Sequence, residues 1–412
     1  MFDARSLSDA RAASAVTVRS VYLARAIRDF ADGFVAVLLP VYFTALGFTA
    51  FEIGCIATAA LFGSALLTLA TGFLGTSRDP RTLLLAACAL MAATGFGYAS
   101  LDEYWPLAIL AFVGTINPSA GSASVFVPLE HAALAGAIAA SDRTGAFARY
   151  SLFGALAAAA GSLAAAAPGG LATYGIEPIV AIQAMFVLYA LLGAIAYVVY
   201  RRMPRTVPRK PRAATAALGP SRNIVYGLAA LFSLDAFAGG LVVQSLLALW
   251  LFERFDVSLA TASAFFFASG LLAAISFPLA AWLGSRIGLI NTMVFTHIPS
   301  SVCLIAVAFA PSTGWAFALL LCRSALSQMD VPARASYVMA VVTADERPAA
   351  ASVTAVPRSL ASAASPAIAG ALFAAGLSTW PLLLCGSLKI LYDVVLLIAF
   401  RAIEPPEERI KH

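Results

Sequence analysis

The sequence contains few charged residues. Asp, Glu, Lys and Arg make up 11% of its 412 residues, whereas 61% are hydrophobic and the mean hydropathy is +0.89. A soluble domain carries about 25% charged residues, because its surface must stay in contact with water. The shortage excludes a water-soluble protein and predicts that lipid surrounds much of the chain.

Residues that usually form metal sites and disulfides are also scarce. The three histidines lie far apart, at His131, His297 and His412, and the five cysteines lie in apolar segments without a CxxC pair. We therefore expect neither a metal site nor a disulfide framework. The sequence also lacks GxxxxGK[ST], the phosphate-binding motif of many ATPases. No cofactor and no direct use of ATP are expected.

Twelve apolar segments are long enough to cross a bilayer as helices, which takes about 20 residues each. Several contain proline, which suits helices that must bend. The predicted spans are 22–46, 52–74, 82–100, 106–128, 146–167, 178–200, 223–251, 259–283, 290–310, 313–335, 355–375 and 380–400. The predicted fold class is an all-α membrane protein with 12 transmembrane helices.

The basic residues predict the orientation of these spans. With the N-terminus inside, the inner segments hold twenty-one of the 26 Lys and Arg residues, and the outer loops hold only Arg254. Cytoplasmic loops are enriched in Lys and Arg, so we expect both termini in the cytoplasm and a multi-pass protein of the cell inner membrane.

The longest polar stretch, 201–222, carries seven basic residues and no acid. It predicts a cytoplasmic linker held at the anionic lipid leaflet, and nucleic acid is not expected as a partner. The linker divides the chain into an N-terminal six-helix bundle at 1–200 and a C-terminal six-helix bundle at 223–412.

The two predicted bundles resemble each other in sequence. Gly33 aligns with Gly240 at an offset of 207 residues, and Arg149 aligns with Arg358 at an offset of 209. Internal repeats with a site at the repeat interface are the usual plan of secondary transporters. We therefore interpret the chain as a duplication, with two pseudo-symmetric halves.

A loop motif points in the same direction. Gly72–Arg81 and Ala281–Ile290, after the second and eighth spans, keep parts of Gly-x-x-x-Asp-Arg/Lys-x-Gly-Arg-Arg/Lys, although Thr76 and Ser285 replace the acid. With twelve spans, a basic linker and a repeat, the chain resembles the major facilitator superfamily over essentially its whole length. The resemblance implies alternating access and a central cavity lined by the first, fourth, seventh and tenth spans.

Ionisable side chains within the predicted spans mark the candidate site, because a charge in lipid is costly unless it faces a cavity or a partner. In the first span Arg25, Arg28, Asp29 and Asp32 lie along one helix face. The predicted substrate- and proton-binding residues are Arg28, Asp29, Asp32, Asn117, Asp235, Arg323, Gln328 and Asp330.

Asp32 is ranked first as proton carrier, since it lies deeper than Asp29. The alternative is that Arg25 and Arg28 neutralise it permanently. Asp235 and Arg323 lie near the middle of their spans and are expected to pair, either as a structural contact or as a pair that changes partner during transport.

Three charged residues in peripheral spans are interpreted as structural. Lys389 and Asp393 have the i, i+4 spacing of a salt bridge along one helix. His297 is interpreted as a packing residue rather than a proton relay.

Further charged residues predict a cytoplasmic gate. Arg149 and Arg358 begin the fifth and eleventh spans, where a cation opposes the helix dipole and needs an acidic partner. The predicted gate residues are Asp79, Arg81, Glu130, Arg149, Arg286 and Arg358, and Asp142, Asp345 and Glu346 are further candidate partners.

The predicted function is secondary active transport of a small-molecule substrate by a monomer in the lipid bilayer, with protons as the coupling ion. Export is favoured, and proton-coupled uptake is the alternative. An enzyme is not expected, because no cluster of His, Cys or carboxylate groups marks one membrane face. A membrane-embedded enzyme, a receptor or a channel remains a more remote alternative.

Overall fold

The computed structural model describes residues 4–74, 78–119, 124–138, 142–205, 218–343 and 346–401. All regular elements of this part of the chain are helices, which confirms the all-α class. The predicted motif residue Thr76, the gate candidate Asp345 and the middle of the basic linker lie outside it. The chain forms two compact units, residues 1–48 with 59–211, and residues 49–58 with 212–412.

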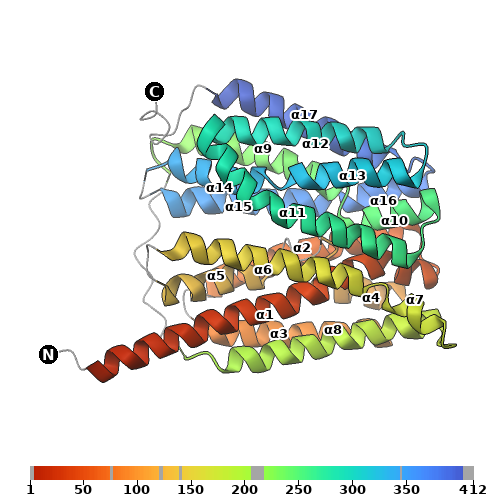
Figure 1. The fold of residues 1–412 in the computed structure, drawn as a ribbon, viewed down its shortest axis with the longest axis horizontal. Coiled ribbons are helices and arrows are strands. Elements are labelled where there is room, and N and C mark those ends of the chain that lie inside the picture. The colour runs from red at the N-terminus through yellow and green to blue at the C-terminus, as the bar shows by residue number, and fades with distance from the viewer. Residues whose placement is uncertain are drawn as a thin grey trace. The chain divides into compact units, whose positions relative to one another are not determined.

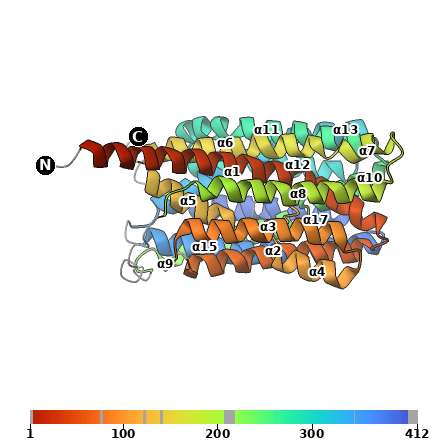
Figure 2. The same ribbon diagram turned by 90° about the horizontal axis from the view of Figure 1, so that it is seen from below.

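The helices of the first unit follow the predicted order of spans. They are α1 (Ala4–Ala45), α2 (Ala50–Leu74), whose first residues group with the second unit, α3 (Pro80–Ser100), α4 (Tyr104–Val113), α5 (Phe126–Ala137), α6 (Arg143–Ala164), α7 (Ala167–Ala172) and α8 (Pro178–Arg201). Helix α1 has 42 residues and extends past the ends of its neighbours α3 and α8 (Figures 1 and 2).

The second unit repeats this order. Its helices are α9 (Arg222–Gly240), α10 (Gln244–Phe255), α11 (Leu259–Ile287), α12 (Leu289–Val307), α13 (Thr313–Ser327), α14 (Asp330–Ala340), α15 (Arg347–Ala364), α16 (Pro366–Ala374) and α17 (Trp380–Phe400). Helix α1 packs on α6 as α9 packs on α15, and α3 packs on α8 as α12 packs on α17. Equivalent helices therefore make equivalent contacts in the two units.

Several predicted spans are interrupted helices. The predicted span 106–128 is wrong as one helix, because α4 ends at Val113 and α5 begins only at Phe126. A second interruption separates α13 from α14 at Gln328 and Met329. By length and composition, eight segments of the described residues qualify as membrane spans; the remaining predicted spans are interrupted or carry charged and small polar residues. Broken helices are tolerated in membranes where protein or a cavity surrounds the freed backbone groups.

Local sequence signals fix the helix ends. Asp79 caps α3, its side chain accepting a hydrogen bond from the Arg81 backbone N–H at 3.2 Å, and Pro80 occupies the first helical position. Ser258 caps α11 in the same way through Thr261 N–H at 3.1 Å. Gly288 joins α11 to α12 with φ of +86°, a conformation that favours glycine.

Glycines set the closest helix contacts. A Cβ atom at Gly161 of α6 would lie 1.9 Å from the Phe30 carbonyl oxygen, and one at Gly33 of α1 would lie 2.1 Å from the Ala158 carbonyl oxygen. Gly240 of α9 has the same role, because its Cβ would lie 2.3 Å from the Ser362 carbonyl oxygen on α15. The sequence alignment of Gly33 with Gly240 thus corresponds to the same helix contact in both units.

We predict that Gly161→Ala lowers the stability of the purified protein by about 1–3 kcal/mol, because the added methyl group meets backbone that cannot yield. The matched control is Gly145→Ala on the same helix, where nothing lies within 4 Å of the new Cβ. Thermal unfolding in detergent measures both variants. Equal melting temperatures for the two would contradict the tight α1–α6 contact.

Candidate functional site

Four charged residues of α1 lie on one face and are directed into the first unit. Arg25 and Asp29 form an ion pair, with Nε and Oδ2 2.7 Å apart. Gly154 on α6 leaves room for this pair, since a Cβ there would lie 2.4 Å from Asp29 Oδ2. The predicted stripe is therefore buried inside the helix bundle.

Glu130 on α5 is the partner of Arg28. The guanidinium donates to Glu130 Oε2 at 2.6 Å, Tyr150 on α6 donates to the same oxygen at 2.5 Å, and Tyr200 on α8 donates to Oε1. Arg28 also lies 3.9 Å from the centre of the Phe126 ring. Three donors thus stabilise the buried Glu130 carboxylate, because an unpaired charge in a low-dielectric interior is costly.

Glu130, a candidate acidic partner of Arg149 and Arg358, does not pair with either of them. Its side chain is fully buried, and its partners Arg28, Tyr150 and Tyr200 come from three helices of the first unit. The residue therefore joins α1, α5, α6 and α8 instead of pairing with Arg149 or Arg358.

Asp32 differs from the other carboxylates of this unit. It is 4% exposed and forms no ion pair within 4.0 Å among the described residues. The Tyr189 side chain of α8 is its hydrogen-bonding neighbour, and the Tyr189 hydroxyl lies 3.0 Å from Thr115 Oγ1. Asn117 is buried in the interrupted span, where its Oδ1 accepts from the Ser119 backbone N–H at 2.8 Å.

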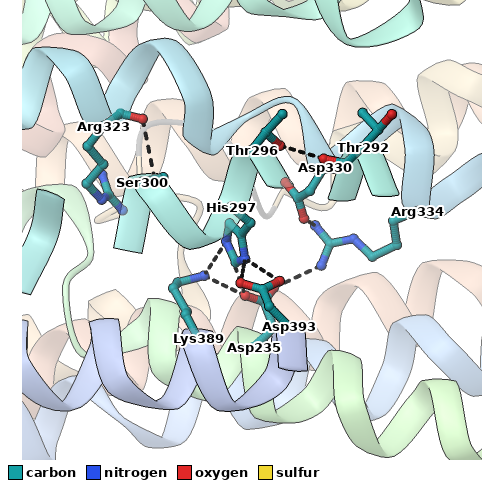
Figure 3. Close-up of polar contacts among 10 residues, drawn as sticks. All are labelled: Asp235, Thr292, Thr296, His297, Ser300, Arg323, Asp330, Arg334, Lys389 and Asp393. Atoms are coloured by element: carbon teal, nitrogen blue, oxygen red, sulfur yellow. Dashed lines mark hydrogen bonds and ion pairs between the residues drawn. The ribbon is translucent and has the colours of Figure 1, made fainter. Parts of the chain in front are cut away.

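The second unit contains a larger buried network, centred on Asp235 of α9 (Figure 3). Asp235 Oδ1 accepts from Lys389 Nζ of α17 at 2.5 Å, and Oδ2 accepts from Arg334 of α14 at 2.9 Å. Arg334 also pairs with Asp330 at 2.8 Å, one helical turn away on α14. The two oxygens of Asp235 thus join three helices through two cations.

His297 of α12 extends this network. Its Nδ1 lies 3.0 Å from Asp393 Oδ2 on α17, and its Nε2 lies 3.4 Å from Lys389 Nζ and 3.8 Å from Asp235 Oδ1. Figure 3 shows the imidazole ring between the lysine and the two carboxylates. His297 is thus buried with partners at both ring nitrogens, and the predicted pairing of Lys389 with Asp393 is wrong, because Lys389 pairs with Asp235.

Arg323 lies apart from the Asp235 network (Figure 3). Among the described residues it forms no ion pair, and its backbone carbonyl accepts a 3.5 Å hydrogen bond from Ser300. The predicted pair of Asp235 with Arg323 is therefore wrong, since Arg334 and Lys389 occupy the carboxylate. Gln328 lies at the interruption between α13 and α14, half-buried.

Of the remaining predicted gate residues, Arg81 and Arg286 lie near helix ends, whereas Arg149 and Arg358 lie within α6 and α15 and do not begin these helices as predicted. Arg81 donates to the Arg201 carbonyl at 2.7 Å, and Arg286 lies 4.5 Å from the centre of the Trp282 ring. Arg149 and Arg358 are exposed and form no ion pair with another described residue.

Glu346, a candidate partner for Arg358, is used elsewhere. Its carboxylate accepts hydrogen bonds from the Gly219 backbone N–H at 2.6 Å and from Thr343 Oγ1 at 2.8 Å. Hydrogen bonds from Thr343 and Ser221 lower the pKa of Glu346 to about 2. This carboxylate therefore fastens the start of α9 to the loop before α15.

Sequence reasoning missed the tyrosines and the histidine of these networks. Tyr150 and Tyr200 carry no charge that would mark them within their spans. His297, Lys389 and Asp393 were visible as ionisable residues in lipid, which is the signal for a functional site. Their spans were set aside because they are peripheral in the family that the sequence resembles.

Comparison with known proteins identifies the fold. A family model described as Major Facilitator Superfamily matches residues 21–329 and 228–412. No curated protein sequence matches the chain. Similar solved structures include a bacterial homologue of the human lysosomal transporter Spinster, with 13% sequence identity, a TM-score of 0.70 and coverage of 94% of this chain and 97% of that one.

Two further solved structures show the same likeness. The nucleoside transporter NupG is 15% identical, with a TM-score of 0.68 and coverage of 94% of this chain and 98% of that one. The human organic anion transporter MFSD10 is 16% identical, with a TM-score of 0.65 and coverage of 93% and 99%. These likenesses identify the two-domain fold of twelve membrane-spanning helices.

We predict that Asp235 and Lys389 are energetically coupled. Either single variant, Asp235→Asn or Lys389→Met, removes one partner of a buried ion pair and should cost about 3–5 kcal/mol of stability. The double variant should recover at least about 1.5 kcal/mol of the summed loss, as contacting charges do in double-mutant cycles. Unfolding in detergent measures all three.

The matched control is the cycle of Asp235→Asn with Arg323→Met. Residues without contact add within about 0.5 kcal/mol, so this pair should show no coupling. Coupling in the second cycle and none in the first would show that the network is assigned to the wrong cation.

Proposed function

Because the chain belongs to the Major Facilitator Superfamily, we propose that it is a proton-coupled secondary transporter that exports a small organic solute by alternating access. The family membership and the transporter fold support the transport of a small molecule. The proposal goes beyond this in three respects, which are proton coupling, the direction of transport and the roles of single residues.

Asp32 is the observation that carries the proton coupling. It is a buried carboxylate without an ion pair in the described part of the chain, whereas Asp29 and Glu130 each have an arginine. Burying an ionised carboxylate without a countercharge costs free energy, and protonation removes that cost. Asp32 is therefore suited to hold a proton in one state of the transport cycle and release it in another.

Tyr189 and Thr115 supply the polar surroundings that such an exchange needs. The tyrosine hydroxyl donates to ionised Asp32 or accepts from the protonated acid, and Thr115 serves as its second partner. Asp32 thus keeps a hydrogen bond in both protonation states, while its net charge changes by one.

The charge distribution supports the proposed location. Twenty-one of the 26 Lys and Arg residues fall on the side that holds both termini in the twelve-span arrangement. We therefore place the protein in the cell inner membrane with both termini in the cytoplasm. In this proposal it acts there as a monomer, and the cytoplasmic gate is formed by Asp79, Arg81, Arg149, Arg286 and Arg358.

Uptake driven by a proton gradient is the competing direction. The solved relatives include a nucleoside transporter and an organic anion transporter, so the fold accommodates substrates of different charge. Arg323, which has no carboxylate partner among the described residues, favours a substrate with an anionic group.

The test uses the full-length protein in vesicles that contain a pH-sensitive dye. Adding a substrate should cause proton movement against the direction of substrate movement, and Asp32→Asn should reduce the proton flux at least about tenfold, since it removes the titrating group. Asp102→Asn, an exposed acid outside both networks, is the matched control and should transport normally. Undiminished proton flux in Asp32→Asn would contradict the assignment, and proton movement in the same direction as the substrate would indicate uptake.

A further inference from the structure

The network around His297 has features that a purely structural ion pair does not need. His297, Asp235 and Asp393 are each less than 5% exposed, and Lys389 is 9% exposed. Two of the contributing helices, α12 and α17, are the third and sixth spans of the second unit. These groups belong to the second unit, whereas Asp32 and the charged stripe on α1 belong to the first.

The neutral imidazole fits the observed distances. Its Nδ1–H donates to the Asp393 carboxylate at 3.0 Å, and its Nε2 accepts from the Lys389 ammonium at 3.4 Å. Both ring nitrogens then have partners, and Lys389 also donates to Asp235 at 2.5 Å. With a neutral imidazole, His297, Lys389 and Asp235 each keep at least one hydrogen bond.

The protonated imidazole requires a different arrangement. An Nε2–H cannot face an ammonium at 3.4 Å, because two donors and two positive charges would oppose each other. Asp235 Oδ1, 3.8 Å from Nε2, is the acceptor on that side of the ring. His297 and Lys389 therefore compete for one oxygen of Asp235, and protonation displaces the lysine.

The charge of the network favours binding one proton. Among the groups in direct contact, the acids Asp235, Asp330 and Asp393 face two cations, Arg334 and Lys389, which leaves one negative charge in excess within this contact set. Arg358 of α15 interacts with Asp235 and Asp330 only from beyond ion-pair distance. A proton from the aqueous phase, added to Nε2, cancels that excess without any other reactant. Imidazole is the side chain that changes charge near neutral pH.

Other ionisable groups on the surrounding helices do not complete the network. Arg323 of α13 and Arg358 of α15 form no ion pair with its carboxylates among the described residues. Helix α11 carries a single ionisable residue, Arg286, close to its end. The ring centroids of Tyr392 and His297 lie 6.0 Å apart in an edge-on contact, and the buried Tyr392 hydroxyl has no hydrogen-bond partner among the described residues.

We propose that His297 is a second proton-binding residue, whose Nε2 alternates between accepting from Lys389 and donating to Asp235. Protonation thereby loosens α17 from α9, because Lys389 is the ion-pair link from α17 to Asp235. The role of this step in transport rests on the proposed proton coupling, but proton binding itself does not.

The test is a pH titration of the purified full-length protein in detergent, without substrate or gradient, by imidazole ¹⁵N NMR. Between about pH 5 and 9, one ring should convert from the Nδ1–H tautomer to imidazolium, and His297→Gln should remove its signals. His131→Gln is the matched control, because His131 lies in the first unit, where its ring contacts Phe147 and Tyr150, and it should leave the His297 signals in place.

Two charge variants should shift the His297 titration in opposite directions. Lys389→Met removes the competing cation and should move the midpoint to higher pH, whereas Asp393→Asn removes an anion and should move it to lower pH, each by about one unit or more. A His297 ring that stays in one form across the range, or that carries its proton on Nε2 when neutral, would overturn the proposal. The titration of the wild-type protein tests proton binding by His297 even where a variant fails to fold. Its outcome does not depend on proton flux through Asp32.

Discussion

The cost of burying charge in lipid is the constraint on which both units depend. Arg28 with Glu130, and Asp235 with Lys389 and Arg334, hold helices together that are far apart in sequence. Hydrophobic burial cannot specify such contacts, because lipid tails are as apolar as the side chains that they would replace. Charged and tyrosine hydroxyl groups therefore determine which helices of each bundle meet, and glycines determine how closely.

The fold was largely predictable from the sequence, because apolar segments long enough to span a bilayer permit few alternatives to helices. The stripe on α1 was also predictable, since i, i+3, i+4 and i+7 spacing places side chains on one face. The interruption around Asn117 was not, because Asn and Pro within an apolar segment are compatible with either a kinked or a broken helix.

The partners of the charges could not be predicted, because spacing along one helix says nothing about contacts across the bundle. Lys389 and Asp393 have the separation of an intrahelical pair, yet both reach across to α9 and α12. Glu130 was expected at the gate as a candidate partner of Arg149 and Arg358, yet in α5 it pairs with Arg28. These contacts join residues 96 to 154 positions apart, and only the packing of the helices determines them.

The length of α1 adds a mechanical consequence. Its 42 residues span about 63 Å at 1.5 Å per residue, roughly twice the hydrocarbon thickness of a bilayer. The part before residue 22 then forms a rigid arm of roughly 25 Å. A tilt of about ten degrees in the buried part would swing the tip of that arm by about 4 Å. Any tilt of this helix would therefore displace its N-terminal end further than the part that lies within the bundle.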